Sequence, residues 1–264
     1  MARPVLLHSG VMHRSARLSA ILDKLADGGS VSVSELSEAL NVSPATIRRD
    51  LVMLEEQQLL GRMHGGAVGR AVSYELPLRY KSVRYGEEKR RIATEAAARV
   101  TEGMAVGLTG GTTATELARV LADRRQLTIV TNALNIASEL AIRPDLKLVV
   151  TGGVARSQSY ELSGPIAEAA LNGLNLDVAF IGVDGIEAKA GCTTYQEIEA
   201  HTNTVMIEQA KRVIVVADSS KIGRVAFARM CTLGQVDELI TNRSGADRAE
   251  VRKLTDVGVR VTFV

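Results

Sequence analysis

The sequence predicts an α/β protein with two domains, a small one of helices followed by a β-hairpin and a larger one built on a mostly parallel sheet. Near the N-terminus, short helical patterns are separated by very short turns and are followed by two apolar segments around a glycine pair. From Ile92 onward, apolar runs rich in β-branched residues alternate with helical stretches. Such runs are buried on both faces, and helical connections between them imply parallel strands.

Length and composition agree with two globular domains. The chain has 264 residues, of which 46% are hydrophobic, and it contains no polar low-complexity tract. No apolar run approaches the roughly 20 residues that span a membrane, and the N-terminus does not resemble a secretory signal. Cys192 and Cys231 allow one disulfide at most, and their spacing does not suggest a metal site. The sequence therefore predicts a cytoplasmic protein with reduced thiols, no metal, no cofactor and no membrane partner.

Two helices are expected before residue 41. The first carries an apolar stripe and ends at Gly28-Gly29. The second is short, is capped by Ser34, and turns Leu36 and Leu40 inward. The apolar stripe of the first helix comprises Leu18, Ile21, Leu22 and Leu25.

A third helix begins in the stretch "SPATIRRDL". Ser43 is a typical N-cap, and Pro44 suits the first helical position, where its missing N–H costs nothing. Ile47, Leu51 and Leu54 recur on one face, so the opposite face is a small, partly basic surface. The pair Arg48-Arg49 has no obvious carboxylate partner on this helix.

The second and third helices form a helix-turn-helix pattern. Only Asn41-Val42 separates them, and the second helix of such a motif lies in the DNA major groove. An exposed arginine there bonds a guanine edge or clamps phosphate, whereas the alternative is a solvated helix face.

The segment "LLGRMHGGAV" then predicts a hairpin with Gly65-Gly66 at its tip, which beside a helix-turn-helix is a wing. The candidate DNA contacts are Ser43, Ala45, Thr46, Arg48, Arg49, Arg62 and His64.

Charge is distributed unevenly along the chain. Residues 1–91 carry 14 Lys and Arg against 10 Asp and Glu, whereas residues 92–264 carry 18 against 20. The local excess is modest, so affinity for double-stranded DNA depends on placement and on doubling of the contacts in an oligomer. We therefore expect a homodimer or homotetramer, held mainly through the second domain.

The segment "VSPATIRRDLVMLEEQQLLGRMHGGA" resembles the N-terminal signature of the DeoR/GlpR family of bacterial transcription regulators. The resemblance implies sequence-specific binding to operator DNA, usually as a repressor. It also implies a winged helix-turn-helix domain, for which we expect residues 14–70, then a linker over 71–86 and an effector-sensing and oligomerisation domain over 87–264.

In the second domain the apolar runs predict the strands of the sheet, and ligands of such sheets lie beyond the carboxyl ends of the strands. The runs are 104–108, 127–131, 146–150, 178–183, 213–217, 238–241 and 259–264.

Four loops at those ends share a chemistry. "TGGTT" (109–113) opens a helix and offers N–H groups and hydroxyls to an anion, and it is joined by "TGG" (151–153), "DG" (184–185) and "DSSK" (218–221). Together they suit a phosphorylated polyol, although a glycine after a single strand is more often a plain turn. The candidate effector contacts are Gly110, Gly111, Thr112, Thr113, Gly152, Gly153, Asp184 and Lys221.

Further segments, among them "VTNALNIASEL", "LSGPIAEAAL" and "ADSSKIGR", resemble the C-terminal sensor domain of the same family. That domain is similar to ribose 5-phosphate isomerase, in which a Thr/Ser-rich loop and a lysine hold the sugar phosphate. One departure is Thr109, where many relatives carry an aspartate that could bond sugar hydroxyls. By resemblance, the strongest effector contacts are Gly111, Thr112, Thr113, Asp184 and Lys221.

Two functions compete at this stage. The first is a regulator, a repressor of a sugar-catabolism operon that a phosphorylated sugar releases from its operator. The second is a phosphosugar isomerase with an added DNA-binding domain, which needs a positioned base. Asp184 and Glu199 are conceivable bases, but no motif pairs an acid with a base, so we expect no enzyme. The residues identify neither the sugar nor the operator.

Overall fold

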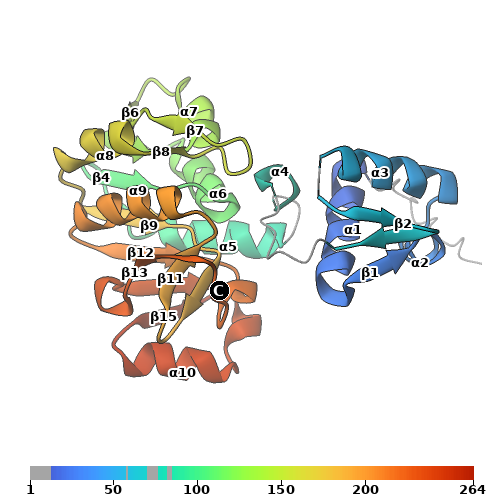
Figure 1. Ribbon diagram of the computed structural model, residues 1–264. Coiled ribbons are helices and arrows are strands. Elements are labelled where there is room, and N and C mark those ends of the chain that lie inside the picture. The colour runs from blue at the N-terminus through green and yellow to red at the C-terminus, as the bar shows by residue number, and fades with distance from the viewer. Residues whose placement is uncertain (1–12, 58, 70–76, 82–84) are drawn as a thin grey trace, which may run out of the picture. The chain divides into compact units, whose positions relative to one another are not determined.

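The computed structural model describes residues 13–57, 59–69, 77–81 and 85–264. The chain divides into two compact units, Met1–Arg84 and Tyr85–Val264 (Figure 1). Most of the segment expected as a linker, 71–86, lies outside the described residues.

The first unit contains the predicted helices and hairpin. The hairpin strands β2 and β3 pair antiparallel, and a third strand, β1, which the sequence did not predict, pairs with β3. Its elements are α1 (Arg14–Gly28), β1 (Ser30–Ser32), α2 (Val33–Leu40), α3 (Pro44–Glu56), β2 (Gly61–Met63) and β3 (Gly66–Val68).

Two local predictions in this unit are wrong. Ser32, not Ser34, caps α2: its hydroxyl accepts from the Glu35 N–H at 3.1 Å, and the Glu35 carboxylate accepts the Ser32 N–H at 2.8 Å. Gly66 is not at the hairpin tip but begins β3. A Cβ at Gly66 would lie 2.2 Å from the Val31 carbonyl oxygen, so glycine permits the close approach of β1.

A short helix, α4 (Leu78–Lys81), packs against α1. Its Tyr80 ring is buried with the core of the first unit, and the Tyr80 carbonyl accepts the Ser19 hydroxyl at 2.8 Å. The core itself is formed by the apolar faces of the helices, including the fully buried side chains of Ile21, Leu36 and Ile47.

The second unit is built on a seven-stranded sheet in the order β15-β14-β12-β9-β4-β5-β6, in which every pair of neighbours is parallel. Each predicted apolar run forms one strand, so the α/β prediction is confirmed. The strands are β4 (Ala105–Leu108), β5 (Leu127–Thr131), β6 (Leu146–Val150), β9 (Val178–Ile181), β12 (Val213–Val216), β14 (Glu238–Thr241) and β15 (Arg260–Phe263).

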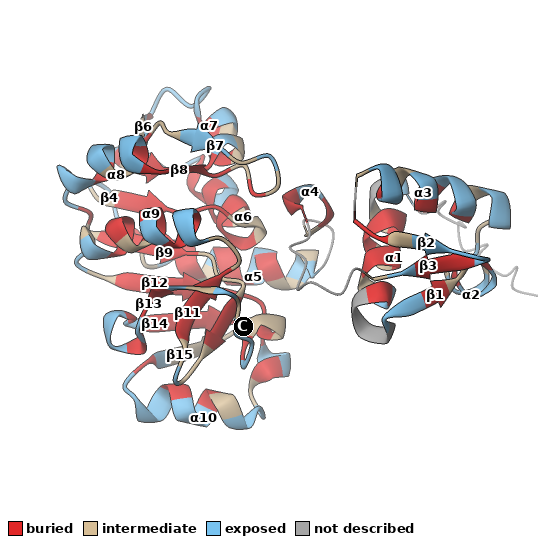
Figure 2. Ribbon diagram, in the orientation of Figure 1, coloured by how far each residue is buried: buried red, intermediate tan, exposed pale blue. Residues whose placement is uncertain are grey.

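Helices cover both faces of this sheet, and its inner strands are largely buried, whereas the edge strands β6 and β15 are partly exposed (Figure 2). Along β12, Ile214 and Val216 pack with α5, α6 and α7, whereas Val213 and Val215 pack with α8, α9 and α10. The helices are α5 (Gly86–Ala97), α6 (Thr112–Leu121), α7 (Leu134–Leu140), α8 (Pro165–Asn172), α9 (Glu197–Glu208) and α10 (Ala249–Asp256).

Short elements that the sequence did not predict lie between these. The strands β10 (Gly185–Glu187), β11 (Gly191–Thr194) and β13 (Ala228–Cys231) form an antiparallel sheet. A two-stranded hairpin joins β7 (Val154–Ala155) to β8 (Leu162–Ser163). Single 3-10 turns are η1 (Ser219–Lys221), η2 (Leu233–Gln235) and η3 (Arg243–Gly245).

Candidate functional site

The exposed face of α3 is the first candidate surface. Ser43 caps the helix by accepting the Thr46 N–H at 3.2 Å, and Pro44 holds the first position. Arg48 and Arg49 are exposed and make no hydrogen bond or ion pair with the rest of the described chain. Ala45 is exposed beside them.

The carboxylate next to these arginines points the other way. Asp50 is buried and accepts a two-point contact from Arg17 of α1, at 2.5 Å from Nε to Oδ2 and 3.3 Å from Nη2 to Oδ1. This contact raises the pKa of Arg17, because the bond to Asp50 favours the charged guanidinium. The inward pair fixes α3 on α1 and leaves the two arginines on the outer face.

The wing supplies two more candidates. His64 is exposed in the turn between β2 and β3. Arg62 is also exposed, and its Nη1 lies 3.6 Å from Oε2 of Glu55 near the end of α3. A surface ion pair of this kind is weak, so it does not prevent Arg62 from reaching a phosphate.

In the second unit, the sheet order creates a switch point between β4 and β9. From β4 the chain builds outward through β5 and β6, then returns to β9 and builds outward on the other side. In open α/β sheets, ligands bind at such a point, outside the carboxyl ends of the strands. The loops after β4, β9 and β12 therefore lie on neighbouring strands and meet there.

The loop after β4 opens α6 at this point. Gly111 has φ of 117° and is the N-cap of the helix, and the Thr115 N–H makes the first helical bond to its carbonyl at 3.0 Å. The N–H groups of Thr112, Thr113 and Ala114 find no acceptor among the described residues. Free N–H groups at a helix N-terminus suit an anion.

Asp184 and Lys221 come together across this edge. Lys221, at the end of η1 after β12, places Nζ 3.4 Å from Oδ1 of Asp184 after β9. Thr194 donates to the other carboxylate oxygen at 3.1 Å. The pair is partly buried. Lys221, the cation predicted from the sequence, therefore lies next to the switch point with the Asp184 carboxylate beside it.

Thr109, Gly152 and Gly153 at the same sheet edge make close packing contacts. Thr109 is fully buried, and its hydroxyl accepts the Gly182 N–H at 2.9 Å, which ties the ends of β4 and β9 together. Gly152 and Gly153 follow β6, which β5 separates from β4. A Cβ at Gly153 would lie 2.8 Å from the Ser163 carbonyl oxygen, so glycine is needed there for close packing of the β7–β8 hairpin.

Sequence reasoning missed Glu161, which the β7–β8 hairpin returns to the same edge. Its Oε2 accepts the side-chain amides of Asn132 at 3.3 Å and Asn203 at 3.1 Å. Burial and the charge of Glu199, with a smaller contribution from Asp184, raise the pKa of Glu161 to about 8. No motif marks this residue in the sequence, because its neighbours are distant along the chain.

A helix-turn-helix with a wing, joined to a separate parallel α/β domain, is the architecture of a two-domain DNA-binding regulator. The chain belongs to the DeoR family: residues 17–70 match the DeoR-like helix-turn-helix domain, and residues 85–243 match the DeoR C terminal sensor domain.

Relatives from several organisms cover nearly the whole chain. The HTH-type transcriptional regulator GlpR of Haloferax volcanii is 37% identical over 247 residues, 93% of this chain and 96% of that protein. The glycerol-3-phosphate regulon repressor of Escherichia coli K12 is 35% identical and covers 88% and 92%. The putative aga operon transcriptional repressor of Escherichia coli O157:H7 is 35% identical and covers 95% and 94%.

Among solved structures, two partial similarities stand out by coverage or by content. Ribose 5-phosphate isomerase A from Methanocaldococcus jannaschii is 22% identical, with 52% of this chain and 54% of that chain covered and a TM-score of 0.39. The sorbitol operon regulator SorC from Klebsiella pneumoniae is 16% identical, with 89% and 98% covered and a TM-score of 0.40.

Proposed function

We propose that this protein is a sequence-specific DNA-binding repressor of a sugar-catabolism operon and that a phosphorylated sugar releases it from its operator. Membership of the DeoR family and the names of the relatives, several of which are repressors, support the first part. The effector part rests on one observation: the open N-terminus of α6 and the Lys221–Asp184 pair lie on neighbouring strand ends at the switch point.

In this proposal, the exposed face of α3 enters the major groove and the wing contacts the flanking backbone. Arg48 and Arg49 contact base edges or phosphates of the DNA. Ser43 and Thr46, at the start of the helix, face the DNA backbone. Arg62 and His64 of the wing add phosphate or minor-groove contacts.

In the sensor domain, the sugar phosphate places its phosphate at the α6 N-terminus, where Gly110, Gly111, Thr112 and Thr113 supply N–H groups and hydroxyls. Lys221 adds a charge-assisted bond, and Asp184 accepts sugar hydroxyls. Gly152 and Gly153, which follow β6, contact the effector from the far side of the same edge.

The protein acts by binding and not by catalysis. The two carboxylates considered as bases already have partners: Asp184 lies beside Lys221, and Glu199 accepts from Ser159 at 2.5 Å and from Arg156 at 3.2 Å. A base held by a cation is a weak proton acceptor. Incubation with ribose 5-phosphate should yield no ketose, and any turnover would favour the isomerase alternative.

We also propose a homodimer or homotetramer held through the second domain. The strand β6 is an edge of the large sheet, and next to it the exposed apolar side chains of Val150, Val154 and Ile166 gather around Gly152. Light scattering should give an oligomer at micromolar concentration, and Ile166→Glu should shift it toward the monomer. A wild-type monomer, both free and on DNA, would contradict this.

The site of action is the cytoplasm, where operator DNA and sugar phosphates are found together. Within the described part of the chain, no helix is long and apolar enough to cross a membrane.

A thermal-shift screen against sugar phosphates tests the effector, followed by gel-shift titration on an operator selected from a random DNA library. We expect one class of sugar phosphate to raise the melting temperature and to weaken operator binding. If no sugar phosphate changes either quantity, the proposed effector is wrong.

A further inference from the structure

Glu161 is fixed deep in the sensor domain, beside the loop that opens α6. The backbone on either side of Glu161 is bonded to the segment that joins β5 to α7. The Leu162 N–H donates to the Asn132 carbonyl at 2.7 Å, and the Leu134 N–H donates to the Tyr160 carbonyl at 2.9 Å. A Cβ at Gly110 would lie 2.3 Å from Oε1 of Glu161. The carboxyl group therefore lies directly against the chain that leads to the α6 N-terminus.

The two oxygens of this carboxyl group differ. Oε2 accepts two side-chain amides, whereas Oε1 accepts no hydrogen bond from the described residues. Asn132, which donates to Oε2, is fully buried, and its own Oδ1 has no hydrogen-bond partner among the described residues. Buried acceptors are nearly always paired. Oδ1 of Asn132 is therefore a buried acceptor that the described chain leaves unpaired, whereas Oε1 of Glu161 keeps some solvent contact.

The charges in this cluster are also unequal. Three carboxylates influence one another here, because both Glu199 and Asp184 act on Glu161. Asp184 has Lys221 as a cationic neighbour at 3.4 Å, and Glu199 has Arg156 at 3.2 Å. Glu161 is bonded only by neutral amides and is 8% exposed. When ionised, it adds one negative charge that no described cation balances.

We propose that the effector is an amino sugar phosphate whose ammonium group binds Glu161 while its phosphate binds the α6 N-terminus and Lys221. This inference rests on the proposed function and specifies its ligand. An ammonium group supplies donors for Oε1 of Glu161, and its positive charge balances the carboxylate that forms on binding. A hydroxyl group in the same place supplies a donor but no charge.

Binding of the amino sugar phosphate is coupled to the release of a proton from Glu161. In the free protein at neutral pH, burial and the neighbouring carboxylates keep Glu161 largely protonated, since its pKa is raised to about 8. The bound ammonium favours the carboxylate, so the Glu161 proton passes to the buffer and the amine keeps its own protons. A neutral sugar phosphate does not drive this release.

The test compares ligands that differ in one group. Calorimetric titration at pH 7 uses glucosamine 6-phosphate against glucose 6-phosphate and galactosamine 6-phosphate against galactose 6-phosphate. We expect the amine of one pair to bind about tenfold more tightly or better than its hydroxyl counterpart. Repeating the titration in buffers of different ionisation enthalpy should show release of part of a proton for the amine only.

Glu161→Gln keeps the size and removes the charge, so it should bring both members of the pair to similar affinity and abolish the proton release. Glu102→Gln, at an exposed carboxylate of the same domain, is the matched control and should change neither. Melting curves establish that the variants are folded. If Glu161→Gln does not fold, the wild-type comparison and its proton release decide.

Each contrary result overturns a different statement. Equal binding of amine and hydroxyl ligands by the wild type, or a preference that survives in Glu161→Gln, overturns the role of Glu161. Binding of another sugar phosphate alone overturns the amino sugar and leaves the proposed function standing. Failure of every sugar phosphate overturns the effector part of the proposed function and leaves the DNA-binding part standing.

Discussion

Arg17 of α1 and Asp50 of α3 form a buried two-point contact, with Nε and Oδ2 2.5 Å apart. Asp50 directly follows Arg48-Arg49 in the sequence, yet it faces the opposite side of the helix. Its inward bond sets the rotation of α3 on α1, and this rotation presents both arginines to solvent. The arginines lack a carboxylate partner because the nearest carboxylate belongs to the core.

Asp50→Ala should destabilise the first unit. It leaves the Arg17 guanidinium buried without its main partner, a change that typically costs about 3 kcal/mol. The melting temperature of the DNA-binding unit should fall, and Arg17→Met with Asp50→Leu should recover much of the loss, because no charge is then left buried. A single variant as stable as the wild type would show that the pair does not hold α3.

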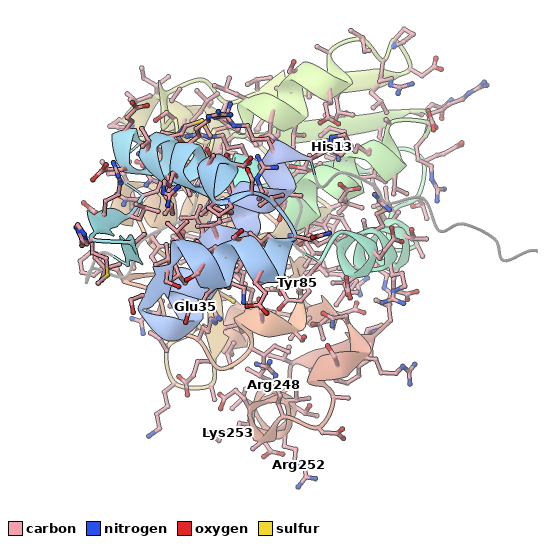
Figure 3. All side chains as sticks on the ribbon, turned by 90° about the vertical axis from the view of Figure 1, so that its right-hand side faces the viewer. His13, Glu35, Tyr85, Arg248, Arg252 and Lys253 are labelled. Carbon is pink, nitrogen blue, oxygen red and sulfur yellow. The ribbon has the colours of Figure 1, made fainter. Side chains whose placement is uncertain are left out.

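Arg49→Ala should weaken operator binding by about 1–3 kcal/mol and relax specificity at one base pair. Gel-shift titration at fixed salt measures this. Arg252→Ala is the control, because Arg252 lies on α10 of the other unit and points away from its ribbon (Figure 3). Parental affinity for Arg49→Ala would mean that another face of the domain reads the DNA.

The sequence predicted the strands of the large sheet because their residues are mainly apolar and the inner strands are buried on both faces. It did not predict β10, β11 and β13. These strands are short and include glycine, threonine and cysteine, and their strand conformation depends on tertiary pairing rather than on a local apolar pattern. Ser32 and Ser34 are equally good caps by residue type, and the reciprocal bond to Glu35 decides between them. The local sequence pattern therefore predicts the strands of the large sheet, but not the small antiparallel sheet or the choice of helix cap.

The same distinction applies to the site. Loops after parallel strands share an edge, so Asp184 and Lys221 were predictable from strand order alone. Glu161 was not, because it depends on a hairpin that folds back across two strand ends to meet Asn132 and Asn203. Asn132, Glu161 and Asn203 are far apart in the sequence and match no known motif, so their cluster cannot be predicted from spacing.

Lys221→Ala should weaken the effector about tenfold or more, because neutral groups do not replace a bond between ammonium and phosphate. Operator affinity without effector should stay the same, since the residue belongs to the sensor domain. Lys189→Ala, at an exposed lysine of the same domain, is the control. Calorimetric titration with the sugar phosphate that stabilises the wild type measures the change, and unchanged affinity would exclude Lys221 from the site.

The sensor domain should lose stability at low pH because Glu238 becomes protonated there. Glu238 is fully buried in β14, and burial alone raises its pKa, but bonds from Arg99 and Thr262 and the charge of Arg212 lower the pKa overall. The ionised form is therefore favoured by folding.

Its contribution is present above the unfolded pKa of 4.5 and is lost as the pH falls through the lower folded value. Glu238→Gln should lower the melting temperature at pH 7, and its difference from the wild type should shrink toward pH 3. A difference that does not change with pH would mean that packing, not charge, stabilises this site.

Glu161 should show the opposite dependence in the absence of any ligand. Because burial and the charge of Glu199 raise its pKa from 4.5 to about 8, folding favours the protonated form. The contribution is complete below pH 4.5 and is lost as the pH rises through about 8. Wild-type stability should therefore fall between these values by more than that of Glu161→Gln, whose amide does not titrate.

The measurement is a series of melting temperatures from pH 5 to pH 9 for both proteins. Glu102→Gln again serves as the control, because an exposed carboxylate with no buried partner should leave the pH profile of the wild type unchanged. At pH 9 the Glu161→Gln variant should equal or exceed the wild type, since the amide avoids a buried charge beside Glu199 and Asp184. Parallel pH profiles would show that Glu161 is ionised throughout this range and that an unseen donor or cation already balances it.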